Sequence, residues 1–268
     1  MLSSPLSLFK NSFTKSIFSA ALLTVLVAVV AALQRQRLFQ IQDSSSTPAS
    51  LQQQSDATAS ALNVAQRLPV FGFDNLVANW FFLQFLQYFG DTDGRQATGY
   101  SLSSDFFKII IPNDPYYRLF YIFLSGSTSN FAAQPEISIN LISQGLEKLT
   151  PTTPPDSFYV WRYKAVDELL FLGNSEAAQQ SFQTAADWAQ QSFHPDAAIM
   201  GESSQRTADF LAANPSSRPA QISAWASVLS NAIDEGTRLK AIEHIEALGG
   251  TVTIDESGRA SIKSPAED

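Results

Sequence analysis

Residues 161–188 predict two helices joined by a tight turn, and this stretch constrains the fold more than any other. Apolar residues recur at helical spacing before the turn: Trp161, Ala165, Leu169 and Leu172. Gly173 ends this first helix, because glycine enters the left-handed conformation of a helix end at little cost. Asn174 and Ser175 can cap the next helix by accepting from its unpaired N–H groups. The stretch therefore predicts an antiparallel helical hairpin.

The turn and the second helix carry a spaced signature of small and aromatic residues: Gly173, Ala178, Phe182 and Ala185. A turn glycine, then a small residue, an aromatic residue and an alanine at these spacings resemble the tetratricopeptide repeat. The first helix departs from that family, because Ala165 and Val166 replace its usual Leu-Gly and the closing proline arrives only at Pro195. The alternative is an ordinary helical hairpin with an alanine-rich seam. The resemblance implies an all-α solenoid of antiparallel helix pairs.

A second copy of the signature favours the repeat, since a lone unit of this kind cannot bury its own apolar face. Forty residues upstream of the first set stand a small, a large and a small residue: Ser138, Ile142 and Gly145. Their partner helix is expected to begin at Asp114 and Pro115. A weaker third copy lies downstream, at Ala220, Ala224 and Ser227. We therefore expect about three hairpins within a helical domain over residues 61–248.

Residues 17–33 form an apolar run broken only by Ser19 and Thr24, within an N-terminal segment 1–39. As a helix the run would be about 25 Å long, close to the hydrocarbon thickness of a bilayer. We expect a retained transmembrane helix; a cleaved signal peptide and a buried globular helix are the alternatives. Lys10, Lys15 and the terminal amine narrowly outweigh Arg35 and Arg37, which favours a cytoplasmic N-terminus. The large domain would then lie in a periplasm or thylakoid lumen.

Three further segments are predicted to connect helices or to end the chain. Residues 40–60 contain thirteen Gln, Ser or Thr and no aromatic side chain, which predicts a flexible linker. Residues 91–104 are polar and predict a loop before a helix over 105–111. The C-terminal segment 249–268 alternates around Gly258 and predicts a small β-hairpin docked on the last helix, which Asp234 caps.

The most aromatic stretch, residues 71–89, predicts a helix from Asp74 to Gly90. It is either the first helix of the solenoid, packed on two sides, or it offers aromatic surface to a membrane or a partner. The candidate interface residues are Trp80, Phe81, Phe85 and Tyr88. This helix follows a predicted span and precedes a second helix start, and its order also resembles a group of bacterial membrane-anchored repeat proteins. The matching residues are Val77-Ala78-Asn79-Trp80-Phe81, Gln87-Tyr88-Phe89-Gly90 and Pro112-Asn113-Asp114-Pro115-Tyr116. That resemblance covers residues 71–248, implies a helical scaffold and names no reaction.

Residues that carry chemistry are sparse. The chain has no cysteine, and its two histidines, His194 and His244, stand fifty residues apart and are expected at the surface, so we expect no metal site. No phosphate-binding glycine loop, nucleophile elbow or dinucleotide fingerprint is present. The carboxylates of Asp167 and Glu168 are expected on a solvated helix face. We therefore expect no enzyme activity and no cofactor.

Charge and architecture together suggest a role. The net charge is −8, and the first forty residues contribute four basic groups and no acidic one, so the remainder carries 13 basic and 25 acidic groups, or −12. Such an acidic domain disfavours nucleic-acid binding. We expect a non-enzymatic, single-pass scaffold that binds protein partners and assembles or stabilises a membrane complex, for which a photosynthetic complex is one candidate. The alternatives are an envelope or transport accessory that binds lipid, glycan or an exported chain, and a self-associating structural protein.

Overall fold

The computed structural model describes residues 23–25, 27–29, 47–213, 218–254 and 260–265. The chain divides into two compact units, Met1–Thr47 and Pro48–Asp268. In the first unit residues 23–25 and 27–29 are helical, and the other residues of the expected span over 17–33 lie outside the described part. Among the described residues, no helix has the length and apolar character needed to cross a membrane.

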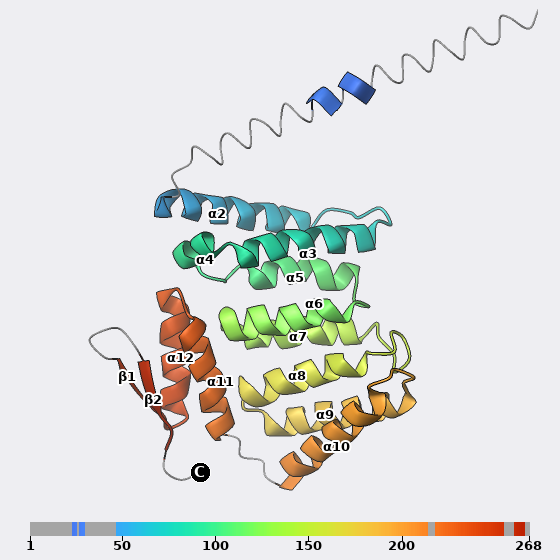
Figure 1. Ribbon diagram of the computed structural model, residues 1–268, viewed down its shortest axis with the longest axis vertical. Helices are drawn as coiled ribbons and strands as arrows, with labels where there is room; N and C mark the ends of the chain where they lie inside the picture. The colour runs from blue at the N-terminus through green and yellow to red at the C-terminus, as the bar shows by residue number, and fades with distance from the viewer. Residues whose placement is uncertain (1–22, 26, 30–46, 214–217, 255–259, 266–268) are drawn as a thin grey trace, which may run out of the picture. The chain divides into compact units, whose positions relative to one another are not determined.

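The described residues of the second unit form eleven α-helices, one π-helix and a two-stranded antiparallel sheet (Figure 1). The elements are α2 (Pro48–Ala65), α3 (Asp74–Gly90), α4 (Thr92–Thr98), α5 (Ser103–Asn113), α6 (Arg118–Leu124), the π-helix η1 (Ser125–Phe131), α7 (Pro135–Leu146), α8 (Phe158–Leu170), α9 (Ser175–Gln191), α10 (Ala197–Ala213), α11 (Arg218–Asn231), α12 (Glu235–Ala247), β1 (Thr251–Ile254) and β2 (Ala260–Lys263). An all-α fold with a C-terminal hairpin is confirmed.

Helix α2 contradicts the predicted flexible linker. Residues 48–60 belong to this helix, whereas residues 40–46 lie outside the described part. The prediction rested on missing aromatic residues, but alanine and glutamine are good helix formers. Leu62 is buried in the main hydrophobic core, and α2 packs on α4 and α5. Packing of one apolar position against the domain thus stabilises a helix whose composition alone does not.

The predicted loop over residues 91–104 is also wrong in part, because it contains α4. Asp91 caps this helix: its Oδ1 accepts from the Gly94 N–H at 3.1 Å. Helix α3 has the predicted bounds, but Asp74 is its first residue and makes no capping hydrogen bond. Helix α5 extends the predicted 105–111 at both ends.

Successive helices from α6 to α10 stack in sequence order (Figure 1). The pair predicted to begin at Asp114 starts later, at Arg118, because the Asp114 carboxylate accepts from the Tyr116 N–H at 3.1 Å in a turn before the helix. The π-helix η1 follows α6 directly, at Ser125–Phe131. All six predicted packing residues of the two repeat copies are buried: Ser138, Ile142, Gly145, Ala178, Phe182 and Ala185. The paired packing of neighbouring helices is confirmed.

Two glycines permit this packing. Gly173 has φ +64°, the left-handed conformation predicted for the turn, and Asn174 caps α9 by accepting from the Ala177 N–H at 3.0 Å. A Cβ on Gly145 would collide with the hydroxyl of Tyr121, whose Oη donates to the Pro115 carbonyl at 2.7 Å. A side chain at position 145 would therefore separate α6 and α7.

Helices α11 and α12 contradict the predicted third copy. They fold back beside the stack, where α11 packs on η1 and α8 (Figure 1). Ala220 and Ser227 are exposed, because the larger apolar residues Ile222 and Trp225 bury the opposite face of α11. The Lys240 Nζ in α12 donates to the Ala133 carbonyl at 2.5 Å, which links this return to the end of η1.

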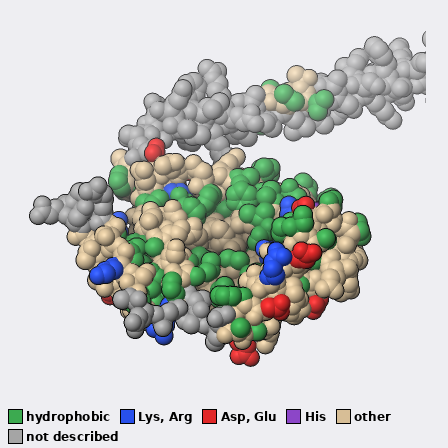
Figure 2. Space-filling view, turned by 60° about the horizontal axis from the view of Figure 1, so that its bottom comes forward, with side chains coloured by type: hydrophobic (Ala, Val, Ile, Leu, Met, Phe, Trp, Pro, Cys, Tyr) green, Lys and Arg blue, Asp and Glu red, His purple; other side chains and the backbone are tan. Residues whose placement is uncertain are grey.

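The predicted hairpin and the cap by Asp234 are confirmed. Asp234 accepts from the Thr237 N–H at 2.9 Å at the start of α12. Val252 pairs with Ile262, and both pack on the α11–α12 core, although the turn at Gly258 lies outside the described residues. On the face shown in Figure 2, hydrophobic, acidic and basic side chains are interspersed.

Candidate functional site

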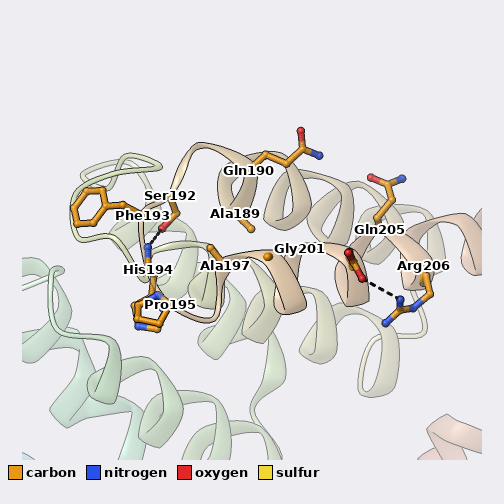
Figure 3. A pocket seen from close by; sticks show the side chains of 12 residues that line it. Ala189, Gln190, Ser192, Phe193, His194, Pro195, Ala197, Gly201, Gln205 and Arg206 are labelled. Carbon is orange, nitrogen blue, oxygen red and sulfur yellow. Dashed lines mark hydrogen bonds and ion pairs between the residues drawn. The ribbon is translucent and has the colours of Figure 1, made fainter.

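An open groove lies where α9 ends and α10 begins (Figure 3). We call it the α9–α10 groove; its volume is about 940 Å³. The last turn of α9, the connecting segment 192–195 and one side of α10 line it; the α10 residues are Ala197, Ala198, Gly201, Glu202, Gln205 and Arg206. A Cβ on Gly201 would lie 3.1 Å from the Cβ of Ala189, so small residues set the close approach of the two helices here.

Six of the twelve residues that line the groove carry polar side chains, and the other six are alanine, glycine, proline or phenylalanine. Gln190 projects from α9 and Gln205 from α10 (Figure 3). The Gln205 Nε2 donates to the side-chain Oε1 of Gln183 at 2.8 Å. Glu202 and Arg206 form an ion pair at 3.6 Å, with both side chains more than 70% exposed, so the pair contributes little stability. Phe193 is the one aromatic hydrocarbon ring in the lining and is 75% exposed. The charges of the lining balance, so the groove is not the acidic surface that the net charge suggested.

Both histidines are half-buried, so the prediction that they lie at the surface is wrong in part. His194 Nδ1 accepts from the Asp196 N–H at 3.1 Å, which orients the ring at the mouth of the groove. The His244 ring stacks on Trp225 with centroids 3.9 Å apart, and burial lowers its pKa, as does the nearby Lys240. Within the described part of the chain, no three histidine, aspartate or glutamate side chains gather as a metal site would require.

The prediction that Asp167 and Glu168 are solvated is wrong. Asp167 is fully buried in α8, where three hydroxyls donate to its carboxylate: Ser125 at 2.8 Å, Ser129 at 2.8 Å and Ser138 at 2.7 Å. Burial is the main cause that raises the pKa of Asp167 from 3.8 to about 6; the serine hydroxyls lower it, and Glu168 raises it. This serine–aspartate cluster joins η1, α7 and α8.

Glu168 is buried beside this cluster and has its own partners. Its Oε1 lies 3.0 Å from the Lys164 Nζ, and its Oε2 accepts from the Ser181 hydroxyl at 2.6 Å. Both carboxylates are bound by side chains of neighbouring helices, so the two acids hold η1, α7, α8 and α9 in register.

Sequence reasoning identified Ser138 as a small packing residue and missed that its hydroxyl binds Asp167. The missed signal was the run Ser125–Ser129, where three serines and a threonine interrupt an otherwise apolar helix. Two of these hydroxyls serve Asp167, whereas those of Ser127 and Thr128 are buried without a hydrogen-bond partner.

The predicted interface residues on α3 separate onto different faces. Trp80 is 60% exposed, Phe81 and Tyr88 are half-buried, and Phe85 is fully buried among aromatic rings. Phe85 therefore cannot belong to an interface. The exposed apolar residues here are Leu76, Trp80, Leu83 and Leu86 on α3, and Phe71 and Phe73 before the helix.

Comparison with known protein families, curated proteins and solved structures finds no match to this chain. The fold and the sites described above therefore define the class of the protein as a mostly helical protein built from paired helices.

Proposed function

We propose that this protein is a tetratricopeptide-like scaffold, anchored in a membrane by residues 17–33, whose α9–α10 groove holds a segment of a partner protein. The groove carries the proposal. Its volume accommodates several side chains of a peptide, and it lies on stacked helix pairs whose repeat residues are buried. Stacked helix pairs commonly present such surfaces to extended or helical partner segments.

The chemistry of the lining favours a protein segment over lipid or glycan. Gln190 offers an amide for peptide groups, and Glu202 and Arg206 offer one charge of each sign, whereas the amide of Gln205 is already bound to Gln183 and Asp209. A lipid tail would leave the side chains of Gln190, Glu202 and Arg206 without partners, and a glycan site would gather several rings, whereas this lining includes a single phenylalanine.

The anchor and the compartment belong to the proposal and rest on the sequence. The apolar run 17–33 with basic residues on both sides supports a single span, and the small excess of positive charge before it supports a periplasmic or lumenal domain. The role is then to hold or help assemble a membrane complex without catalysing a reaction.

The experiment is an affinity purification of the tagged full-length protein in mild detergent beside a variant that lacks residues 1–40. Ala198→Arg places a long cation in the groove from an exposed position, and Ile199→Arg makes the matched change one residue further on, outside the lining. We expect defined membrane-complex subunits to copurify with the wild type and Ile199→Arg, and to be lost with Ala198→Arg. Equal recovery with both variants would remove the groove from the proposal, and recovery of no subunit would reject the scaffold role.

A further inference from the structure

Helix α3 carries an uncovered apolar face. Leu76 is 67% exposed, Trp80 60% and Leu83 57%, and Phe73 before the helix is 63% exposed. Positions 73, 76, 80 and 83 recur at helical spacing and so lie along one side of the helix. We call these four residues the α3 face. Phe71 in the preceding turn is 84% exposed and extends the apolar surface.

The opposite side of α3 is fully used by the core. Ala78, Phe82 and Phe85 are buried there, and the ring of Phe85 lies 4.7 Å from that of Phe107 in α5. Helix α3 is therefore apolar on both sides while the described domain covers only one. A helix that is apolar on all sides is normally covered on all sides, so we expect another molecule or a membrane to cover the α3 face.

The chemistry around the α3 face fits a lipid surface. Residues 48–90 contain only three charged side chains, Asp56, Arg67 and Asp74, although the domain as a whole is rich in acids. The α3 face itself consists of one tryptophan, one phenylalanine and two leucines. Aromatic and aliphatic side chains with few charged neighbours are typical of helices that lie in the boundary between headgroups and acyl chains.

The chain also places a membrane within reach of this part of the domain. Fourteen residues, 34–47, separate the expected span from the start of α2, and they extend over at most about 50 Å. Among the helices of the domain, α2 and α3 are the first after this tether. A bilayer is therefore available to the α3 face at high local concentration.

We propose that the α3 face lies in the interfacial layer of the bilayer in which residues 17–33 are anchored. The proposal deepens the proposed function and rests on it for the anchor. The α3 face gives the domain a second contact with the membrane besides the anchor, which fixes the orientation of the domain. The α9–α10 groove then always has the same orientation relative to partners in the membrane. A tether alone would leave the domain free to rotate.

The chain contains no cysteine, so a single introduced cysteine takes one nitroxide label. The full-length protein is reconstituted in phosphatidylcholine nanodiscs with labels at Leu76→Cys, Leu83→Cys or Val25→Cys, one at a time. Ile199→Cys is the matched control, since Ile199 is 66% exposed on α10. The measurement is collision of the label with oxygen, which concentrates in lipid, relative to a water-soluble nickel chelate.

We expect the oxygen-to-nickel ratio at Leu76 and Leu83 to exceed the ratio at Ile199 several-fold, with Val25 higher still. If Val25 reports lipid while Leu76 and Leu83 match Ile199, the α3 inference is overturned and the anchor of the proposed function stands. If Val25 reports water, the anchor fails, and lipid contact at Leu76 and Leu83 alone supports a purely peripheral α3 face. Shielding of Leu76 and Leu83 from both reagents overturns the inference in favour of a protein occupant, which spin–spin broadening identifies as a second copy.

Discussion

The α3–α5 region and the α8–α10 region are packed in opposite ways. Large rings fill the first: Phe85 contacts the rings of Phe82, Phe89, Phe106, Phe107 and Phe123. Small residues fill the second, where Ala165, Ala178 and Ala208 form one cluster with Phe182 and Leu211. Aromatic rings bury a large apolar area, whereas alanines allow the backbones of neighbouring helices to approach closely.

The buried polar groups follow the same division. The α8–α10 region adjoins the serine–aspartate cluster, which accepts only one arrangement of η1, α7 and α8, because each hydroxyl must reach the Asp167 carboxylate. In the ring-packed region the buried Arg95 of α4 stacks on Tyr88 at 3.6 Å and donates to the Gly99 carbonyl at 2.6 Å, so its hydrogen bond is local and joins no separate helices. The α3–α5 region is therefore stabilised mainly by the burial of rings. In the α8–α10 region, hydrogen bonds and the close approach of backbones fix the register of the helices.

Phe85→Ala tests the ring-packed region and should have the largest effect. The ring is fully buried, so its loss leaves a cavity among five aromatic neighbours and lowers the free energy of unfolding by about 3–5 kcal/mol. Phe73→Ala is the matched control, since Phe73 is 63% exposed, and its effect should stay within about 0.5 kcal/mol. Urea unfolding measures both. Similar values for the two variants would mean that Phe85 does not organise this core.

Asp167→Asn tests the hydrogen-bonded region through the pH dependence of stability. The folded-state pKa of about 6 lies above the ordinary value of 3.8, so the folded protein binds more protons between these values and loses stability as the pH rises through about 6. Relative to the wild type, Asp167→Asn should therefore gain on the order of 3 kcal/mol between pH 4 and pH 7. Urea unfolding at several pH values gives this difference.

Ser138→Ala sharpens the same test. It removes one hydroxyl that lowers the pKa of Asp167, so the loss of stability should shift to higher pH. If the stability difference between wild type and Asp167→Asn is constant with pH, the carboxylate is not held as the structure shows.

Features that depend on neighbours in sequence could be predicted. The left-handed Gly173, the caps by Asn174 and Asp234 and the two sets of buried repeat residues all follow from spacings of a few residues. The serine–aspartate cluster could not, because its serines stand 29 to 42 residues before Asp167 and meet it only after η1, α7 and α8 pack. The prediction for residues 48–60 was wrong for the same reason, because helix α2 depends on contacts with α4 and α5.

The candidate sites show the same limit. The rings of α3 were recognised, but which of them face outward depends on where α5 and α6 pack, so Phe85 and Trp80 could not be separated in advance. No residue pattern in the sequence indicated the α9–α10 groove, because the groove depends on how α10 is placed after the short segment 192–196.

Gly173→Ala has the smallest expected effect and tests whether the α8–α9 turn also positions α11. At φ +64° an alanine costs about 1–2 kcal/mol, and its Cβ would lie 2.5 Å from the Gln221 side-chain oxygen in α11. Gly126→Ala is the matched control: it lies in η1, where an added Cβ would meet no atom within 4 Å, so stability should be unchanged or rise by about 0.5–1 kcal/mol. Equal losses in the two variants would contradict the special role of the turn. If only Gly173→Ala lowers stability, and amide exchange in α11 becomes faster, the α8–α9 turn also holds α11 in place. The turn then joins the alanine-packed stack to the returning helices α11 and α12, whereas in the ring-packed region side chains alone join the helices.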